Sequence, residues 1–488
     1  MKKIYSLITV LFVPALLWAQ TDKELAEQAT NQAIIKSHIG FLASDELKGR
    51  DTPSEGLKIA AKYIESRFLE YGVNMGPGME SYMQPVPMKK VAPRKTAAIK
   101  VGKTELMLNT DFVVIDGDES VFDQPFYYAK YGMPDDLTKE NIEGKVVFTI
   151  CGDGESQNPQ EWFTLSGEKR KKVKELGGLA LIELYSSAQL PWNFLVRYLS
   201  REQVIINETS EEGSISHIWL NRSVEDVSFL DSKKPASIVI GESESENFIS
   251  QNVVGYVEGT DPKLKDEFIV YSAHYDHVGI GQADANGDSI YNGSRDNAVG
   301  IVTVLSAAKS IAANPTKRSA LFVLFTGEEK GLLGSKYFVD NAPIELSKMV
   351  YCFNSDNGGY NDTSKATIIG LGRTTADEMI IEACKAFGLE ATDDPAPDQN
   401  LFDRSDNVRF AAKGIPAPTF GMGFTAFDAE ITKYYHQPGD NPETLDYVYL
   451  EKFFRSYVYA CRMIGNAKKA PFWVKGDKYY EAGKELYK

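Results

Sequence analysis

The sequence predicts an α/β fold in which a mostly parallel or mixed sheet is buried between layers of helices. Near-continuous apolar runs of strand length occur at 268–273, 320–325 and 350–354. Helical patterns of apolar residues occur between and after these runs, at 298–312 and 375–387. Strands that are apolar on both faces and alternate with helices are typical of a sheet that is covered on both sides. Ligands of such sheets bind at the carboxyl ends of the strands.

The first 19 residues have the features of a signal peptide. A basic start at 1–3 precedes an almost wholly apolar stretch from Ile4 to Leu17, and Ala19 offers a small residue for cleavage. The apolar stretch is shorter than the ~20 residues that a membrane-spanning helix needs. We therefore expect cleavage near Ala19, export to the periplasm or the cell exterior, and no stable insertion in a membrane. An uncleaved anchor is the alternative.

The elements that follow alternate between helical and strand patterns. A helical pattern runs from about Thr21 to Val73 and is interrupted by a loop at 42–56 that is rich in Asp, Gly, Pro and Ser. Short β-prone runs follow from Met79 to Val114. After the first central strand, further elements are predicted as a helix at 332–339, a strand at 366–370, a helix at 405–412, a strand at 417–420 and a helix at 450–464.

The segment 121–239 differs from the rest because it holds no recognisable set of candidate ligands. It contains a strand at 144–150, a charged helix at 168–176 and further strands at 179–184 and 217–220. We interpret it as an inserted, smaller β-rich domain that shapes or covers a site. A separate catalytic unit is the weaker alternative. The predicted domains are a discontinuous catalytic domain of residues 20–120 and 240–470, this insert, and a C-terminal extension at 471–488.

The composition is that of a globular protein with room for two domains. Hydrophobic residues make up 43% and charged residues 25% of the 488 residues, so a large core is available. The formal net charge of -15 argues against a nucleic-acid-binding protein, which would need a basic face. No CxxC spacing is present, which argues against a thiolate zinc cluster, although an exported protein permits a disulfide. The four cysteines are Cys151, Cys352, Cys384 and Cys461.

The first candidate ligand, His274, directly follows a predicted strand. On an extended segment residues two apart point the same way. Asp276 can therefore accept one N–H of the His274 ring while the other nitrogen binds a metal, an arrangement that fixes the orientation of metal-bound imidazoles. A buried His–Asp pair without metal is the alternative.

The other candidates also lie next to predicted elements. Asp296 directly precedes a helix, where an ordinary N-cap is the alternative. Glu328 and Glu329 leave a buried strand together, and two adjacent carboxylates repel unless one is neutralised. One of them could bind a metal while the other takes a proton from water; a solvated helix start is the alternative. Asp356 follows another apolar strand, and His436 lies in a loop where a surface histidine is the alternative.

In chain order, the motifs HYD, GSRDN, GEE, NSD and YH resemble those of the M28 family of two-metal zinc exopeptidases. The opening block at 41–68 and the segment at 405–417 are similar to further parts of that family. The insert, with GKVVFTI and a helix before GGLALIEL, is similar to the protease-associated domain that interrupts many of these enzymes.

The resemblance implies a catalytic centre with two zinc ions, for which cobalt or manganese could substitute. It also implies a cis peptide bond after Asp296 and hydrolysis of a peptide next to a free amino terminus. Position by position, the resemblance makes His274 and Asp356 ligands of one ion and Glu329 and His436 ligands of the other. It makes Asp296 the ligand that bridges the two ions. Glu328 becomes the general base, and Asp276 becomes the partner of His274.

Two departures from the family pattern leave the substrate preference open. Arg295 stands where the family often has a small residue, and Asn407 where a histidine is common. A carboxypeptidase or dipeptidase on the same metal pair is an alternative that needs a cationic pocket, for which Arg295, Arg404 and Arg409 are candidates. A non-catalytic peptide-binding protein is a further alternative. Three histidines are given no ligand role: His277 is expected to support a ligand or to lie at the surface, and His38 and His217 are expected to be structural.

Overall fold

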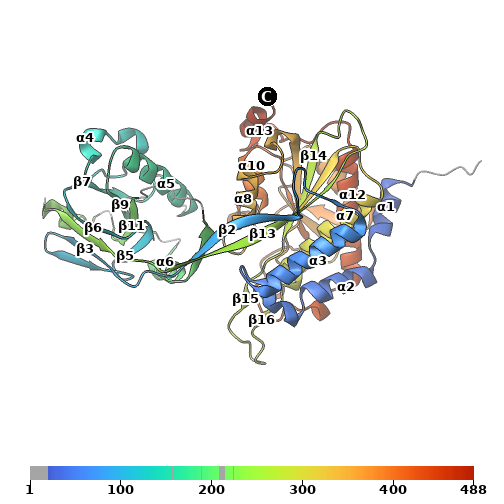
Figure 1. Cartoon of the computed structure of the whole chain (residues 1–488), viewed down its shortest axis with the longest axis horizontal. Coiled ribbons are helices and arrows are strands. Elements are labelled where there is room, and N and C mark those ends of the chain that lie inside the picture. The colour runs from blue at the N-terminus through green and yellow to red at the C-terminus, as the bar shows by residue number, and fades with distance from the viewer. Residues whose placement is uncertain (1–19, 157–158, 188–189, 208–214, 224, 233) are drawn as a thin grey trace, which may run out of the picture. The chain divides into compact units, whose positions relative to one another are not determined.

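The computed structural model describes residues 20–156, 159–187, 190–207, 215–223, 225–232 and 234–488 (Figure 1). The predicted signal peptide lies outside the described residues. The chain divides into two compact units. Unit 1 comprises the residues before Pro85 together with Gln251–Lys488, and unit 2 comprises Pro85–Ser250. None of the helices in the described ranges has the length and apolar character to cross a membrane.

Unit 1 is built on a mixed sheet with a parallel centre. The strands follow the order β13-β17-β14-β18-β21-β19-β20. β14 pairs in parallel with both β17 and β18, and the outer pairs β13–β17 and β19–β21 are antiparallel. This confirms the predicted fold class. The strands are β1 (Asn74–Met75), β13 (Ser245–Val257), β14 (Phe268–His274), β17 (Ser319–Phe325), β18 (Met349–Asn354), β19 (Lys365–Ile369), β20 (Glu390–Thr392) and β21 (Thr419–Met422), with a small hairpin of β15 (Gly279–Ile280) and β16 (Ile290–Tyr291).

The central strand β14 contributes to a hydrophobic core on each face of the sheet. Ile269 and Tyr271 belong to the larger core, together with residues of α1, α2, α3, α7, α9 and α12. Phe268 and Val270 belong to the second core, together with residues of α8 and α10. Figure 1 shows α1, α2, α3, α7 and α12 on one side of the sheet and α8 and α10 on the other. The near-continuous apolar character of β14 therefore follows from burial on both faces.

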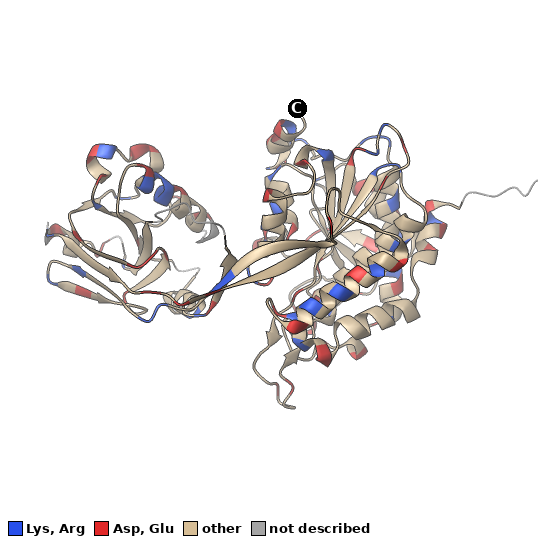
Figure 2. Ribbon diagram, in the orientation of Figure 1, with Lys and Arg blue, Asp and Glu red and all other residues tan. Residues whose placement is uncertain are grey.

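The helices of unit 1 begin and end at conventional capping residues in several cases, of which α3 is the clearest. Ser54 Oγ accepts a hydrogen bond from the main-chain N–H of Leu57 at 3.1 Å, and Gly72 ends the helix with a φ of 75°. Charges of both signs lie on α3 (Figure 2). The helices are α1 (Asp22–Ala29), α2 (Gln32–Leu42), α3 (Glu55–Tyr71), α7 (Val299–Ala313), α8 (Leu333–Asp340), α9 (Asp377–Ala386), α10 (Asn407–Ala412), α11 (Ala429–Thr432), α12 (Tyr447–Asn466) and α13 (Tyr480–Leu486).

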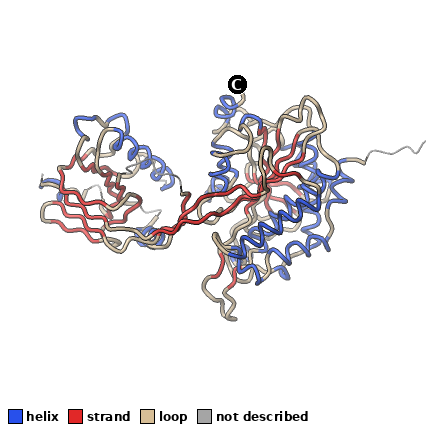
Figure 3. Tube along the Cα trace, in the orientation of Figure 1, coloured by secondary structure: helices blue, strands red, loops and turns tan. Residues whose placement is uncertain are grey.

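Unit 2 contains two sheets that enclose a core of their own (Figure 3). One sheet has the order β5-β11-β9-β8-β7 and is parallel except for β5, and the other has the order β4-β3-β12-β6 and is antiparallel. The elements are β2 (Met83–Val91), β3 (Ala97–Val101), β4 (Thr104–Met107), β5 (Phe112–Asp116), β6 (Ser120–Gln124), β7 (Phe126–Tyr128), α4 (Lys139–Ile142), β8 (Val146–Ile150), α5 (Pro159–Glu175), β9 (Ala180–Tyr185), α6 (Trp192–Leu199), β10 (Gln203–Ile206), β11 (Ser216–Asn221) and β12 (Ala236–Ile240). The chain enters this unit within β2 and leaves it within β13.

Unit 2 is longer than the insert that the sequence predicts. The stretches 85–120 and 240–250, which we assigned to the catalytic domain, belong to unit 2. The physical reason is strand pairing between distant segments: β3 pairs with β12, and β5 pairs with β11. Such pairings are non-local and leave no mark on the local apolar pattern.

The C-terminal segment 471–488 is not the separate extension that we predicted, but packs into unit 1. Trp473 is 1% exposed and belongs to the second core of unit 1. Its indole Nε1 donates to the main-chain oxygen of Gly414 at 2.9 Å. The segment is therefore an integral part of unit 1. The permissible disulfide is also absent, since Cys151, Cys352, Cys384 and Cys461 are all buried and free.

Candidate metal centre

Three neighbouring strands of unit 1 bring candidate ligands to one edge of the sheet. β14 ends at His274, which is paired in register with Phe325, the last residue of β17. Glu328 and Glu329 follow β17, and Asp356 follows β18. Because these strands are parallel, their carboxyl ends meet at the same edge.

Asp296 comes from the loop that precedes α7. Its peptide bond to Asn297 is cis, as the resemblance implies. The carboxylate of Asp440 holds this loop, because it accepts hydrogen bonds from the main-chain N–H groups of Arg295 at 2.8 Å and of Asp296 at 3.4 Å. The side chain of Asn297 donates to the main-chain oxygen of Ser355 at 2.9 Å and so ties the loop to the end of β18.

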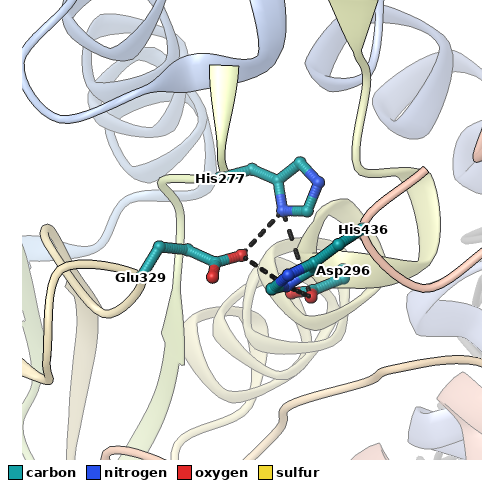
Figure 4. A group of neighbouring side chains, drawn as sticks. All are labelled: His277, Asp296, Glu329 and His436. Carbon is teal, nitrogen blue, oxygen red and sulfur yellow. Dashed lines mark hydrogen bonds and ion pairs between the residues drawn. The ribbon is translucent and has the colours of Figure 1, made fainter. Parts of the chain in front are cut away.

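The two carboxylate oxygens of Asp296 face two different histidines. Its Oδ1 lies 3.3 Å from Nε2 of His274, and its Oδ2 lies 3.1 Å from Nε2 of His436. His274 Nε2 is also 3.1 Å from Asp356 Oδ1. His436 Nε2 is 3.2 Å from Glu329 Oε1 (Figure 4). Asp296 thus lies between two histidine–carboxylate pairs, which is the geometry of a bridging ligand.

The donor atoms fit divalent metal ions. Two groups of side chains could each hold an ion. The first group contains His274, Asp296 and Asp356, and the second contains His277, Asp296, Glu329 and His436. Within each group the possible ligand atoms lie within 4.8 Å of one another. Imidazole nitrogen combined with carboxylate oxygen, without thiolate, suits zinc. All five residues that the sequence nominates as ligands belong to these groups.

In this centre the carboxylates stabilise the protonated form of the neighbouring imidazoles and so raise the pKa of His274 and His436. Burial lowers the pKa of His436, but hydrogen bonds to Asp296 and Glu329 outweigh it and raise this pKa to about 10. Burial likewise opposes the shift of His274, whose pKa is raised well above its ordinary value by Asp356 and Glu328. Burial raises the pKa of Glu329, but hydrogen bonds to His277 and His436 prevail and lower it to about 2. A metal cation can replace these imidazole protons.

Glu328 lies beside the two groups without belonging to either. It lines the pocket next to His274 and Asp356 and is half-buried. Burial raises the pKa of Glu328 well above its ordinary value, and the neighbouring carboxylates Asp356 and Glu329 raise it further against the opposing effect of His274. A carboxyl group with a raised pKa at such a position can give and take a proton.

Asp276 does not hold His274 in the way that the sequence predicts. Nδ1 of His274 is 3.2 Å from the main-chain oxygen of Asp276, while the Asp276 carboxylate is 3.9 Å away. That carboxylate accepts hydrogen bonds from the main-chain N–H groups of Glu328 at 3.1 Å and Glu329 at 3.3 Å. The rule that residues two apart point the same way fails here because β14 ends at His274. Asp276 therefore positions the turn that carries the two glutamates.

His277 is fully buried, so the surface alternative that we considered for it is wrong. Its Nδ1 lies 2.8 Å from Glu329 Oε1, and its ring packs edge-on against His436 (Figure 4). Nε2 has no hydrogen-bond partner. If Nδ1 bound a metal, Nε2 would carry an unpaired buried N–H, which is costlier than an unpaired acceptor. The geometry therefore favours an Nδ1–H that donates to Glu329 and orients it.

Of the three arginines considered for a substrate carboxylate, only Arg404 lines the pocket. Arg295 is buried, and its guanidinium donates to Asp440 Oδ1 and Thr444 Oγ1, each at 2.8 Å. Arg409 donates to the main-chain oxygen of Gly331. Asn407 is also committed to the fold, because its side-chain amide donates to the carbonyls of Phe402 and Ala417.

The pocket at the centre has a volume of about 130 Å³ and an apolar wall. Its lining includes the candidate ligands His274, Asp296, Glu329, Asp356 and His436. It also includes the apolar residues Ile369, Leu401, Met422, Phe424, Phe427 and Ile431.

Asp440 is a functional candidate that the sequence analysis missed. It is 2% exposed, and it positions Asp296 through the hydrogen bonds described above. Its only sequence signal is an acidic residue between Gly439 and Asn441, which is typical of an ordinary turn.

The chain is similar to several known aminopeptidases. Residues 252–460 match the sequence model of peptidase family M28. Aminopeptidase YwaD of Bacillus subtilis is 24% identical over 328 residues, which are 67% of this chain and 63% of that protein. A probable leucine aminopeptidase 2 of Aspergillus oryzae is 27% identical over 229 residues, 42% of this chain and 43% of that protein. The chain thus spans less than two thirds of the length of these relatives.

One solved structure shares the fold at low sequence identity. The aminopeptidase from Aneurinibacillus sp. strain AM-1 superimposes with a TM-score of 0.56 at 18% identity, covering 93% of this chain and 97% of that one.

Proposed function

We propose that this protein is an exported aminopeptidase with two zinc ions. It would hydrolyse the first peptide bond of peptides that have a free amino terminus. The match of residues 252–460 to the sequence model of peptidase family M28 supports this proposal. The observation that carries the proposal is Asp296, whose two oxygens face separate histidine–carboxylate pairs. The aminopeptidases among its relatives support the choice of substrate end.

Each ion has a set of residues that would hold it. His274 and Asp356 would hold one zinc ion, Glu329 and His436 would hold the other, and Asp296 would bridge the two. Cobalt or manganese could occupy the same N and O donors. Bound zinc would supply a Lewis acid and would lower the pKa of water towards ~7.

Glu328 would act as the general base and then as the general acid. Its carboxylate would accept a proton from the attacking water and deliver that proton to the leaving amine. Burial and the neighbouring carboxylates raise the pKa of Glu328, which suits both steps. Asp276 would keep Glu328 in place through the main-chain N–H that its carboxylate binds.

The apolar wall of the pocket supports a preference for an apolar first residue. Phe424, Phe427 and Ile431 are among the residues that line the cavity. Burial of an apolar side chain there would contribute about 1.5–3 kcal/mol to binding.

The proposal is tested with the purified chain from Gln20 onward. We expect about two zinc equivalents by elemental analysis and hydrolysis of leucine anilide, with no hydrolysis of the N-acetylated compound. Removal of metal by a chelator should abolish the activity, and zinc should restore it. A protein that binds no zinc, or that cleaves the blocked compound equally well, would refute the proposal.

A dipeptidase or carboxypeptidase is a second candidate because Arg404 lines the pocket and is exposed. A guanidinium there could pair with the terminal carboxylate of a short substrate. This candidate predicts cleavage of N-acetylated dipeptides and its loss in Arg404→Gln. The matched control is Arg409→Gln, which removes an arginine that does not line the pocket. A metal-loaded protein that binds peptides without cleaving any would instead favour the binding-protein alternative.

The proposal also includes export of the protein and the identity of unit 2. The sequence of residues 1–19 supports export, which N-terminal sequencing of the secreted protein would test. Unit 2 is proposed to be a protease-associated domain, on the basis of the motifs in its parallel strands.

A further inference from the structure

Arg50 is a fully buried arginine whose guanidinium is held by main-chain carbonyls. It lies in the loop between α2 and α3. Its Nε donates to the oxygen of Tyr275 at 3.0 Å, and its Nη2 donates to that of Gly293 at 3.0 Å. Its Nη1 donates to the oxygen of Asn292 at 2.8 Å and to that of Leu42.

The acceptors of Arg50 belong to two loops that carry candidate ligands. Tyr275 lies directly after His274, and Gly293 lies three residues before Asp296. The main chain of Arg50 adds another link, because its carbonyl oxygen accepts the N–H of His277 at 3.2 Å. One residue from the N-terminal part of the chain therefore binds both ligand loops.

The chain around Arg50 is also packed tightly against the β15–β16 hairpin, which joins the two loops. Gly49 has a φ of +68°, and a Cβ atom there would lie 2.5 Å from the carbonyl oxygens of both Gly279 and Tyr291. Asn292 also donates from its side chain to the carboxylate of Asp45 at 2.9 Å. The segment from Asp45 to Arg50 thus has little freedom to move independently of the loops.

The charge of Arg50 complements the centre without occupying its ligand atoms. Burial lowers the pKa of Arg50 to about 10, against the opposing effect of Asp296 and Asp276, so the guanidinium is charged at neutral pH. Because its N–H groups bond to carbonyls, the carboxylate oxygens remain free for cations. A planar fork can reach several acceptors at fixed angles, whereas a lysine ammonium cannot reproduce that pattern.

We infer that Arg50 is a positioning residue of the metal centre, which holds the His274 loop and the Asp296 loop at the separation that two metal ions require. The inference rests on the proposed function, because it presupposes that the centre binds metal. It adds a residue that touches neither substrate nor ligand atoms and acts through the main chain of both loops.

The test compares Arg50→Lys and Arg50→Ala with the same substitutions at Arg462. Arg462 is a matched control, since it is 3% exposed in unit 1 and its guanidinium donates to the carbonyls of Ser310 and Asn314, at the opposite end of α7. Zinc affinity is measured by equilibrium with a metal buffer, and folding by circular dichroism. We expect both Arg50 variants to lose about 10- to 100-fold in zinc affinity. Added guanidinium ion should restore part of the affinity of Arg50→Ala.

The outcomes separate the inference from the function on which it depends. If the wild-type protein binds no zinc, the proposed function fails. If the wild-type protein binds two equivalents and a folded Arg50→Lys binds zinc as tightly as Arg462→Lys, the inference alone fails. A loss in the Arg50 variants with guanidinium rescue supports it.

A measurement on the wild-type protein decides the matter if neither Arg50 variant folds. Hydrogen exchange is compared between metal-free and zinc-loaded protein. The inference expects zinc to slow exchange in the segment 45–50 and at the amide of His277, and to leave the middle of α12 unchanged. Exchange in 45–50 that does not respond to zinc would overturn it.

Discussion

Units 1 and 2 each bury a polar cluster beside the parallel strands of a sheet, and the two clusters differ in charge balance. In unit 2, Glu183 accepts from Lys169 at 3.3 Å and Thr149 at 3.2 Å with one oxygen, and from His217 at 2.8 Å and Trp219 at 3.1 Å with the other. Every oxygen there meets a donor. In unit 1, carboxylates from five residues gather around three imidazoles: Asp276, Asp296, Glu328, Glu329 and Asp356 around His274, His277 and His436.

The difference in charge balance indicates which of the two clusters needs a bound cation. Burial raises the pKa of Glu183, but His217 and Lys169 reverse this effect and lower it below the ordinary value, so the cluster of unit 2 is satisfied by the chain itself. The cluster of unit 1 has five carboxylates and three imidazoles, and a buried carboxylate without a counter-charge is costly. A buried histidine or carboxylate is therefore a weak indication of a metal site, whereas an excess of buried carboxylates over cationic side chains is a strong one.

The largest expected effect comes from Asp296→Asn. Loss of this charge should reduce bound zinc from two equivalents to fewer than one and should bring peptidase activity to background, because both ions would share this ligand in the proposed centre. The matched control in the other cluster is Glu183→Gln, which should leave the zinc content unchanged. Two zinc equivalents in folded Asp296→Asn, measured by elemental analysis, would contradict the proposed difference between the two clusters.

Glu328→Gln should lower the catalytic rate without changing metal binding. We expect kcat to fall by about 10²- to 10⁴-fold, because a positioned general base contributes an effect of this size. Zinc content should remain at two equivalents, since Glu328 lies outside both groups of ligand atoms. Turnover close to that of the wild-type protein would rule out its role as the base.

Lys169→Met should affect unit 2 alone. It leaves Glu183 buried without its lysine, and breaking a buried ion pair from one side costs about 3–5 kcal/mol of folding free energy. Thermal unfolding with hydrogen exchange should show the loss in β8 and β9, while zinc binding by unit 1 is unchanged. Stability equal to that of the wild-type protein would mean that the pair contributes little.

The smallest effect is the pH dependence of the metal-free centre. Because the folded-state pKa of His436 is raised from 6.5 to about 10, its protonation stabilises the metal-free fold fully below pH 6.5, and this contribution is lost as the pH rises to about 10. Glu329, lowered to about 2, contributes stability above pH 4.5 that is lost as the pH falls to about 2. Chemical denaturation of the metal-free protein should show the loss above pH 6.5, and zinc should remove it. A flat profile between pH 6.5 and 10 would contradict the assigned environment of His436.

Much of the architecture follows from local sequence patterns. The apolar runs gave the central strands β14, β17 and β18 to within a residue or two, because burial on both faces demands apolar side chains throughout. The order of strands and helices also predicted which edge of the sheet would collect His274, Glu329 and Asp356.

Other features depend on contacts between segments that are far apart in the chain. The boundaries of unit 2 follow from the pairing of β3 with β12, and the burial of Trp473 follows from its packing in the second core. Neither can be recognised from a window of neighbouring residues.

By itself, the sequence determined the fold class, the strand ends and the residue types that reach the centre. Tertiary structure alone decided that Asp296 faces two separate histidines, that the Asp276 carboxylate binds the turn of the two glutamates, and that Arg50 holds both ligand loops. The physical reason is that apolar periodicity is a local property of the chain. The direction of a side chain beyond the end of a strand, by contrast, is set by partners that the fold brings from elsewhere.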